Sequence, residues 1–155
     1  MAPEAGDAAP AFTLPDDTGG QVSLADFQGT KLVLYFYPRD DTPGCTKEAI
    51  AFTEHLDAFK AADTAIVGVS KDTVAKHGKF RAKHNLGIPL ASDAEATVCE
   101  DYGVWVEKNM YGRKSMGIER ATFLIDRNGN VARVWRKVKV PGHAEAVLDA
   151  AKALA

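Results

Sequence analysis

Cysteine is scarce in this chain of 155 residues, which contains only Cys45 and Cys99. Two cysteines cannot build a disulfide scaffold, and neither stands in a CxxC pair or beside a histidine at the spacing of a zinc site. The four histidines are scattered along the chain. The two thiols are therefore either reactive or buried and inert.

Other absences narrow the class of protein further. No apolar run approaches the roughly 20 residues of a membrane span, so no membrane partner is expected. Residues 1–7 lack a basic stretch followed by an apolar core, which favours a cytoplasmic protein over a secreted one. Lys and Arg number 19 against 21 Asp and Glu, a net charge of −2 that argues against nucleic-acid binding. No GxGxxG or phosphate loop is present, and we expect no cofactor or metal.

The composition that remains is that of a globular protein, with 46% hydrophobic and 26% charged residues. No repeat, low-complexity tract or linker interrupts it, so a single domain over residues 1–155 is expected. The pattern predicts strands over 12–14, 21–24, 31–37, 65–69, 88–90, 121–125 and 131–135. It predicts helices over about 43–62, from Asp72 to about His84, briefly around Val98 and Cys99, and from Gly142 onwards.

Three local signals support this assignment. Residues 31–37 are apolar at nearly every position, which is typical of a strand buried on both faces. Asn128-Gly129 between two β-rich runs is the strongest short hairpin signal. Asp72 can cap the helix that follows it, and Asp93 or Ser92 can cap the brief helix. Early parallel strands, a late antiparallel hairpin and a closing helix predict an α/β fold with a mixed central sheet, flanked by helices and preceded by an N-terminal β-hairpin, like that of thioredoxin.

The segment Thr42-Pro43-Gly44-Cys45 follows the apolar run directly and opens a helical pattern. It places the Cys45 thiol at a helix N-terminus, where unpaired N–H groups and a partial positive charge favour an anion. The thiolate is the reactive form, and a free cysteine is only about 3% thiolate at pH 7. A helix terminus contributes about 0.3–1 kcal/mol, so a nearby cation is also required. Cys45 is the candidate nucleophile.

Read backwards from Cys45, residues 38–45 spell PxxxTxxC, which resembles the active-site signature of the peroxiredoxins. The longer stretch from Tyr35 to Thr46 resembles the peroxiredoxin Q, or bacterioferritin comigratory protein, branch. Further matches lie at 103–105, 110–113 and 122–126. The resemblance implies a thioredoxin-like fold and a thiol peroxidase that reduces hydrogen peroxide and organic hydroperoxides in antioxidant defence. It also implies a monomer that thioredoxin, glutaredoxin or glutathione recycles.

The resemblance also implies roles for individual side chains. Cys45 would attack the peroxide, and Arg120 would stabilise both the thiolate and the charge that develops on the peroxide. The Thr42 hydroxyl and the Cys45 backbone N–H would hold the peroxide oxygens, and Pro38 would cover the thiolate. Glu48 would help orient the arginine, with Gly44 as a further supporting residue. Structural alternatives exist, since Thr42 can simply cap the helix and a lone arginine is most often a surface charge.

One position departs from that branch. Many members carry a resolving cysteine five residues after the nucleophile, where this chain has Ile50. The sulfenic acid formed on Cys45 must condense with another thiol, either an external one or Cys99. We expect Cys99 to be a packed core thiol and hypothesise that the protein works with one cysteine.

Three other functions compete with the peroxidase. A thioredoxin-like disulfide oxidoreductase requires CxxC, but Thr42 occupies the first position. A peroxide sensor or holdase-type binding module would react once and stop, whereas a peroxidase turns over with a recycled reductant. A purely structural domain would consume no peroxide, so Cys45→Ser would change nothing.

Overall fold

The computed structural model describes residues 2–155, apart from the side chain of Met110. The strands are β1 (Thr13–Pro15), β2 (Gln21–Ser23), β3 (Lys31–Phe36), β4 (Thr64–Ser70), β5 (Leu90–Ser92), β6 (Trp105–Met110), β7 (Arg113–Ile118), β8 (Ala121–Ile125) and β9 (Val131–Arg136). The helices are α1 (Pro43–Glu54), α2 (Leu56–Ala61), α3 (Val74–His84), α4 (Val98–Asp101) and α5 (His143–Ala153), and a 3-10 turn spans Leu24–Phe27.

The central sheet has five strands in the order β5-β4-β3-β8-β9. β3 is parallel to β4, with Leu34 opposite Val67, and antiparallel to β8, with Leu34 opposite Phe123. The predicted mixed sheet and thioredoxin-like α/β fold are therefore confirmed. The two predicted hairpins, β1–β2 and β8–β9, are also present.

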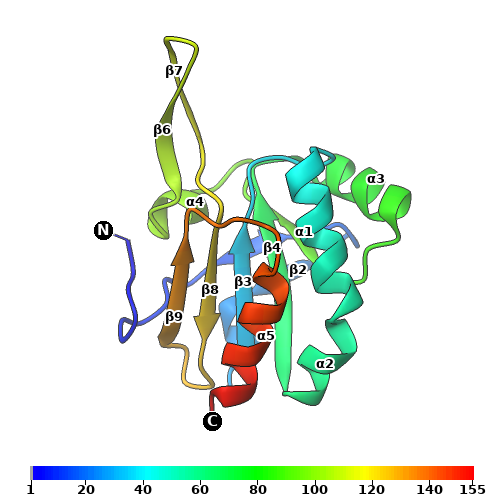
Figure 1. The fold of residues 1–155 in the computed structure, drawn as a ribbon, viewed down its shortest axis with the longest axis vertical. Coiled ribbons are helices and arrows are strands. Elements are labelled where there is room, and N and C mark those ends of the chain that lie inside the picture. The colour runs from blue at the N-terminus through cyan, green and yellow to red at the C-terminus, as the bar shows by residue number, and fades with distance from the viewer. Residues whose placement is uncertain (1) are drawn as a thin grey trace.

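β3 lies in the middle of the protein because its side chains are buried on both faces. Leu32, Leu34 and Phe36 belong to one core cluster, together with residues of β1, β2 and α4. Val33, Tyr35 and Tyr37 belong to the other, together with residues of α1, α2, α3 and α5. Helices α1, α2 and α5 cover the front of the sheet in Figure 1. The predicted site lies at the carboxyl end of β3, where α1 begins.

The single helix predicted over about 43–62 is wrong, because it is two helices that meet at His55. The Thr53 hydroxyl donates a hydrogen bond of 2.8 Å to the Ala49 carbonyl. A threonine bonded back to the residue four positions earlier bends a helix, which accounts for a break just after it.

The predicted cap at Asp72 is also wrong. Thr73 caps α3, and its side chain accepts a hydrogen bond from the Lys76 N–H. The Asp72 carboxylate is already occupied, because it accepts hydrogen bonds from the Asp40 N–H and the Ser70 hydroxyl. Asp93 does act at the start of α4, where its carboxylate accepts hydrogen bonds from the Val98 and Cys99 N–H groups.

The sequence pattern missed the hairpin β6–β7, which projects from the body of the protein (Figure 1). Its two-residue turn is Tyr111-Gly112, with φ of 54° and 78°, the geometry of a type I′ turn. β7 is exposed over most of its length, so it lacks the apolar alternation that identifies a half-buried strand. The strand predicted over 88–90 is displaced, since β5 begins at Leu90.

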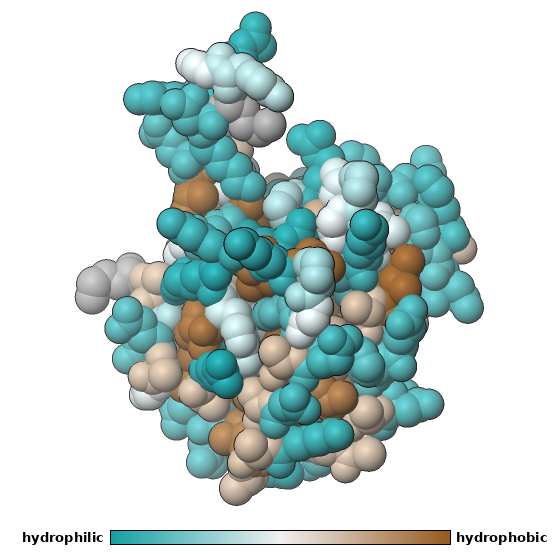
Figure 2. Space-filling view, in the orientation of Figure 1, coloured by the Kyte–Doolittle hydropathy of each residue, from teal (hydrophilic) through white to brown (hydrophobic). Residues whose placement is uncertain are grey.

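Within residues 2–155, no helix is both long enough and apolar enough to cross a membrane. The face of the protein seen in Figure 2 is mostly hydrophilic, with hydrophobic residues in separate small patches.

Candidate active site

Cys45 is the third residue of α1, after Pro43 and Gly44. Proline suits the first helical position because its missing N–H has no partner there in any case. The Cys45 side chain packs against the sheet in the same core cluster as Val33, and the residue is 1% exposed. The thiol is therefore held at a helix N-terminus, almost fully shielded from solvent.

Thr42 precedes α1 in the N-cap position, but its side chain makes no capping hydrogen bond. Its hydroxyl instead donates to the Arg39 carbonyl at 3.0 Å. The oxygen of that hydroxyl keeps its lone pairs for another donor, and the first-turn N–H groups are left uncapped by Thr42. Both groups are free to meet oxygen atoms placed beside the sulfur.

Arg120 comes from the far side of the chain, in the two-residue link between β7 and β8. Its Nη2 lies 3.3 Å from the Cys45 Sγ, within hydrogen-bond distance for sulfur. The arginine predicted from sequence therefore does lie against the thiol, 75 residues away in the chain.

Glu48 holds the other end of that guanidinium. Its Oε1 lies 2.6 Å from the Arg120 Nη1, and the Glu48 side chain is 1% exposed. Burial raises the pKa of Glu48 to about 7, although the charge of Arg120 opposes the shift. Burial lowers the pKa of Arg120, but the charges of Glu48 and Cys45 outweigh it and leave that pKa raised. Glu48 follows Cys45 by three residues, which places both on one face of α1.

Gly44 lies against the same guanidinium. A Cβ atom at this position would stand 3.2 Å from the Arg120 Nη2, tighter than ordinary van der Waals contact. The absence of a side chain at residue 44 therefore leaves room for the guanidinium, which a Cβ would push back by a few tenths of an ångström.

Pro38 lines a cleft of about 490 Å³ between the loop after β3 and the β6–β7 hairpin. Its walls also include Arg39, Lys71, Trp105 and Met116. A further cation, Lys108 of β6, has a lowered pKa, first through partial burial and then through repulsion by Arg120. Lys108 and this wall of the cleft could not be predicted, because the hairpin that carries them was not.

Two more buried groups surround the site. Within residues 2–155, the Tyr35 hydroxyl and the Glu48 Oε2 are the buried side-chain oxygens without a hydrogen-bond partner. Burial, followed by the charges of Glu48 and Cys45, raises the pKa of Tyr35. The His143 Nε2 lies 2.8 Å from the Thr122 hydroxyl and shares a hydrogen bond with it. Burial, followed by the charge of Arg120, lowers the pKa of His143 to about 4.

Cys99 is not part of this cluster. It lies in the core on the other side of the sheet, with Leu34 and Phe36, and is 0% exposed. Burial, together with the charge of Asp93, raises the pKa of its thiol. The structure thus brings Cys45, Arg120, Glu48 and Gly44 together and leaves Cys99 apart.

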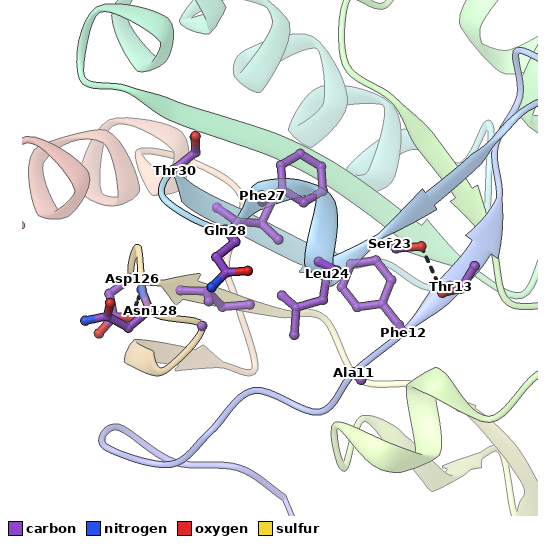
Figure 3. Close-up of a pocket in the computed structure, with 14 residues that line it drawn as sticks. Ala11, Phe12, Thr13, Ser23, Leu24, Phe27, Gln28, Thr30, Asp126 and Asn128 are labelled. Carbon is purple, nitrogen blue, oxygen red and sulfur yellow. Dashed lines mark hydrogen bonds between the residues drawn. The ribbon is translucent and has the colours of Figure 1, made fainter.

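The pocket drawn in Figure 3 is a separate feature. It has a volume of about 440 Å³ and is lined by Phe12, Leu24, Phe27 and other residues near the start of β3. Cys45 follows the opposite end of that strand, and the pocket contains none of the predicted site residues. In the described part of the chain, no group of three or more His, Cys, Asp or Glu side chains is arranged to hold a metal ion.

Comparison with known proteins identifies the family of the chain. The sequence profile of the AhpC/TSA family matches residues 5–134. The chain is 47% identical to peroxiredoxin Bcp of Bacillus subtilis over 152 residues, covering 98% of this chain and 97% of that protein. It is 42% identical to peroxiredoxin Bcp of Escherichia coli over 146 residues, covering 94% of each.

Solved structures are equally similar. The bacterioferritin comigratory protein of Xanthomonas campestris, whose structures concern its alkyl peroxide reduction activity, superposes with a TM-score of 0.87 at 47% identity, over 92% of this chain and 90% of that one. Peroxidoxin BcpB of Mycobacterium tuberculosis superposes with a TM-score of 0.87 at 35% identity, over 99% of each chain. The chain belongs to the AhpC/TSA family, in its peroxiredoxin Bcp (peroxiredoxin Q) branch, and is a thiol-dependent peroxidase.

Proposed function

We propose that Cys45 is the peroxidatic thiol and that Arg120 is the group that activates it. The observation that carries this proposal is the 3.3 Å contact between the Arg120 Nη2 and the Cys45 Sγ. The guanidinium carries a fixed positive charge within hydrogen-bond distance of the sulfur, so it stabilises negative charge at that position. Glu48 supports it as a positioning residue, because its 2.6 Å bond to Nη1 fixes the plane of the guanidinium.

The reaction follows from this arrangement. The Cys45 thiolate attacks the terminal oxygen of the hydroperoxide, a sulfur–oxygen bond forms, and the O–O bond breaks. The alkoxide leaves and takes up a proton to become an alcohol, while Cys45 becomes a sulfenic acid. Arg120 faces the oxygen on which negative charge develops, so it stabilises the transition state as well as the thiolate.

Groups at the start of α1 align the peroxide with the sulfur. The Thr42 hydroxyl donates to the Arg39 carbonyl, so its oxygen accepts the peroxide O–H. The Cys45 N–H, left uncapped by Thr42, donates to a peroxide oxygen. We assign to Pro38, which lines the cleft beside the loop after β3, the role of covering the sulfur and limiting its contact with water and further oxidant. Positioning of this kind accounts for reactivity beyond that of a free thiolate.

The sulfenic acid is resolved by an external thiol rather than by Cys99. Support comes from the placement of Cys99 across the sheet and from the raised pKa of its buried thiol. The external thiol attacks sulfur and releases water, and a second thiol reduces the mixed disulfide. Thioredoxin, glutaredoxin and glutathione are the candidate reductants. We place the enzyme in the cytoplasm, where such thiols are kept reduced, and expect a monomer, which sedimentation would test. Like the Xanthomonas protein, it should accept alkyl hydroperoxides.

Stopped-flow consumption of hydrogen peroxide and of an alkyl hydroperoxide tests the assignment of roles. Cys45→Ser should abolish the reaction, whereas Arg120→Met should leave a folded protein that reacts about 100-fold or more slowly. The control is Arg133→Met, because Arg133 lies over Trp135 and should not affect the rate. Equal rates for wild type and Arg120→Met would contradict the proposal.

A further inference from the structure

The loop between β3 and α1 is fastened to α3 by a buried hydrogen-bonded trio. The Tyr37 hydroxyl donates to the Asp40 Oδ1 at 2.5 Å, and the His77 Nδ1 lies 2.6 Å from the Asp40 Oδ2. Tyr37, Asp40 and His77 are 1%, 7% and 0% exposed. Among the described residues, none of these side chains forms a hydrogen bond with the Cys45 sulfur, whose partner is Arg120, and none takes part in the reaction derived above.

The hydrogen bonds of His77 define how the trio is joined. Its Nε2 lies 3.0 Å from the Ala91 carbonyl, which only accepts, so Nε2 must donate. Its Nδ1 then faces the Asp40 carboxylate at 2.6 Å and also lies 3.3 Å from the Tyr37 hydroxyl, so each of the three side chains is within hydrogen-bond distance of the other two. Charge-assisted bonds of this length are about twice as strong as neutral ones, and they are not weakened by water at a buried site.

Two further contacts tie the same loop to the α3 region. The Asp40 N–H donates to the Asp72 carboxylate at 2.7 Å, just before α3 begins. On the outside, Asp41 forms an ion pair of 2.9 Å with Lys83, and its other carboxylate oxygen lies 3.1 Å from the His84 Nε2. Asp41 has a φ of 62°, a strained conformation that persists only when its surroundings impose it. The loop is thus held by α3 on its buried and its exposed sides.

We propose that Asp40 and His77 are positioning residues that form a latch, holding Pro38 and Thr42 in the geometry the peroxide requires. The latch acts only through that loop, which ends two residues after Asp40 at the start of α1. Opening it would misplace the Thr42 hydroxyl and withdraw Pro38 from the sulfur. The inference rests on the proposed roles of Pro38, Thr42 and Cys45.

Two rates measured on each variant test the latch. One is the second-order rate with peroxide, which needs the aligned loop. The other is alkylation of Cys45 by iodoacetamide, which needs only an accessible thiolate. In Asp40→Ala and His77→Leu, the peroxide rate should fall about 10- to 100-fold, while alkylation should become faster because Cys45 is less covered. A role in stability alone would not move the two rates in opposite directions in folded protein.

Asp40→Asn is the conservative variant. Its amide oxygen can still accept from Tyr37, and its amide N–H can donate to the Nδ1 of a neutral His77, so the latch stays closed. Its peroxide rate should lie within about threefold of wild type. The matched control is Asp93→Asn, which removes a buried carboxylate that caps α4 on the other side of the sheet. It should lose stability without changing either rate.

Three results would overturn the latch: unchanged rates in folded Asp40→Ala, a parallel fall in both rates, or a loss in Asp40→Asn equal to that in Asp40→Ala. If His77→Leu does not fold, the two Asp40 variants decide the question. A wild-type protein that did not react with peroxide would instead refute the proposed function. Faster alkylation of the Asp40→Ala variant would still report the opened loop in that case.

Discussion

Gly44 and Arg120 fit each other closely, since a Cβ on Gly44 would lie 3.2 Å from the Arg120 Nη2. Arg120 is held at its other end by Glu48, so the guanidinium has little freedom to retreat. A single methyl group at residue 44 would therefore press on the guanidinium that lies 3.3 Å from the Cys45 sulfur.

Gly44→Ala should slow peroxide reduction about 10-fold or more while the protein remains folded, because the added methyl displaces Arg120 from Cys45. Stopped-flow rates and thermal unfolding measure the two effects. Gly78→Ala is the matched control. Gly78 lies in α3 with open space around its Cβ position, so this change should add roughly 0.5–1 kcal/mol of stability and leave the rate unaltered. A normal rate for Gly44→Ala would refute the steric argument.

Glu48 should make the stability of the protein depend on pH. Its pKa is raised from 4.5 to about 7, so between these values the folded protein holds a proton that the unfolded chain has released. The free energy of unfolding should therefore fall as pH rises from 4.5 to about 7, by on the order of 3 kcal/mol. Urea unfolding at several pH values in this range measures how the free energy of unfolding changes with pH. Glu48→Gln should remove the part of that change that Glu48 causes. An identical slope in both proteins would count against a protonated Glu48.

His143 should make the free energy of unfolding change with pH in the opposite direction to Glu48. Burial, then the charge of Arg120, lowers its pKa from 6.5 to about 4, so the unfolded chain binds a proton that the folded protein does not. Its contribution to stability is present above pH 6.5 and is lost as pH falls towards 4. His143→Gln keeps a hydrogen-bonding group for Thr122 and should abolish this loss. Urea unfolding curves at the same pH values test this prediction. It is wrong if the free energy of unfolding of His143→Gln falls between pH 6.5 and 4 as much as that of the wild type.

Cys99→Ala should leave peroxide turnover unchanged, because Cys99 lies across the sheet from Cys45. It should cost about 1 kcal/mol of stability through the small cavity it creates. Intact mass after one equivalent of peroxide provides the chemical test. Wild type and Cys99→Ala should both gain one oxygen atom on Cys45. A loss of two hydrogens that disappears in Cys99→Ala would mean that Cys99 does resolve the sulfenic acid.

The parts of the fold that were predictable from sequence are those with strong local signals. The uninterrupted apolar run of β3 and the Asn128-Gly129 turn of β8–β9 gave the right elements. The β6–β7 hairpin was not predictable, because β7 is exposed over most of its length. Its turn also has tyrosine, rather than asparagine or aspartate, at the first left-handed position. The break at His55 depends on one side-chain hydrogen bond, which no periodicity reveals.

The site divides in the same way. Cys45 and Thr42 lie in one contiguous motif, so their proximity follows from the chain itself. Arg120 was located only through the family resemblance, because its approach to sulfur depends on how β8 pairs with β3. Lys108 and the Asp40–His77 contact depend on long-range packing between segments whose individual patterns give no sign of it.

The central sheet lies between the two sulfur atoms, so the thiol on the far side from Cys45 can be used to measure how often the folded protein opens. In a Cys45→Ser background, the remaining thiol is sealed in the core and meets a labelling reagent only in molecules in which α4 has lifted from the sheet or the whole domain has unfolded. Its rate of modification therefore counts opening events directly. A single native residue would thus report how often this face of the sheet is uncovered, with no probe added to the chain.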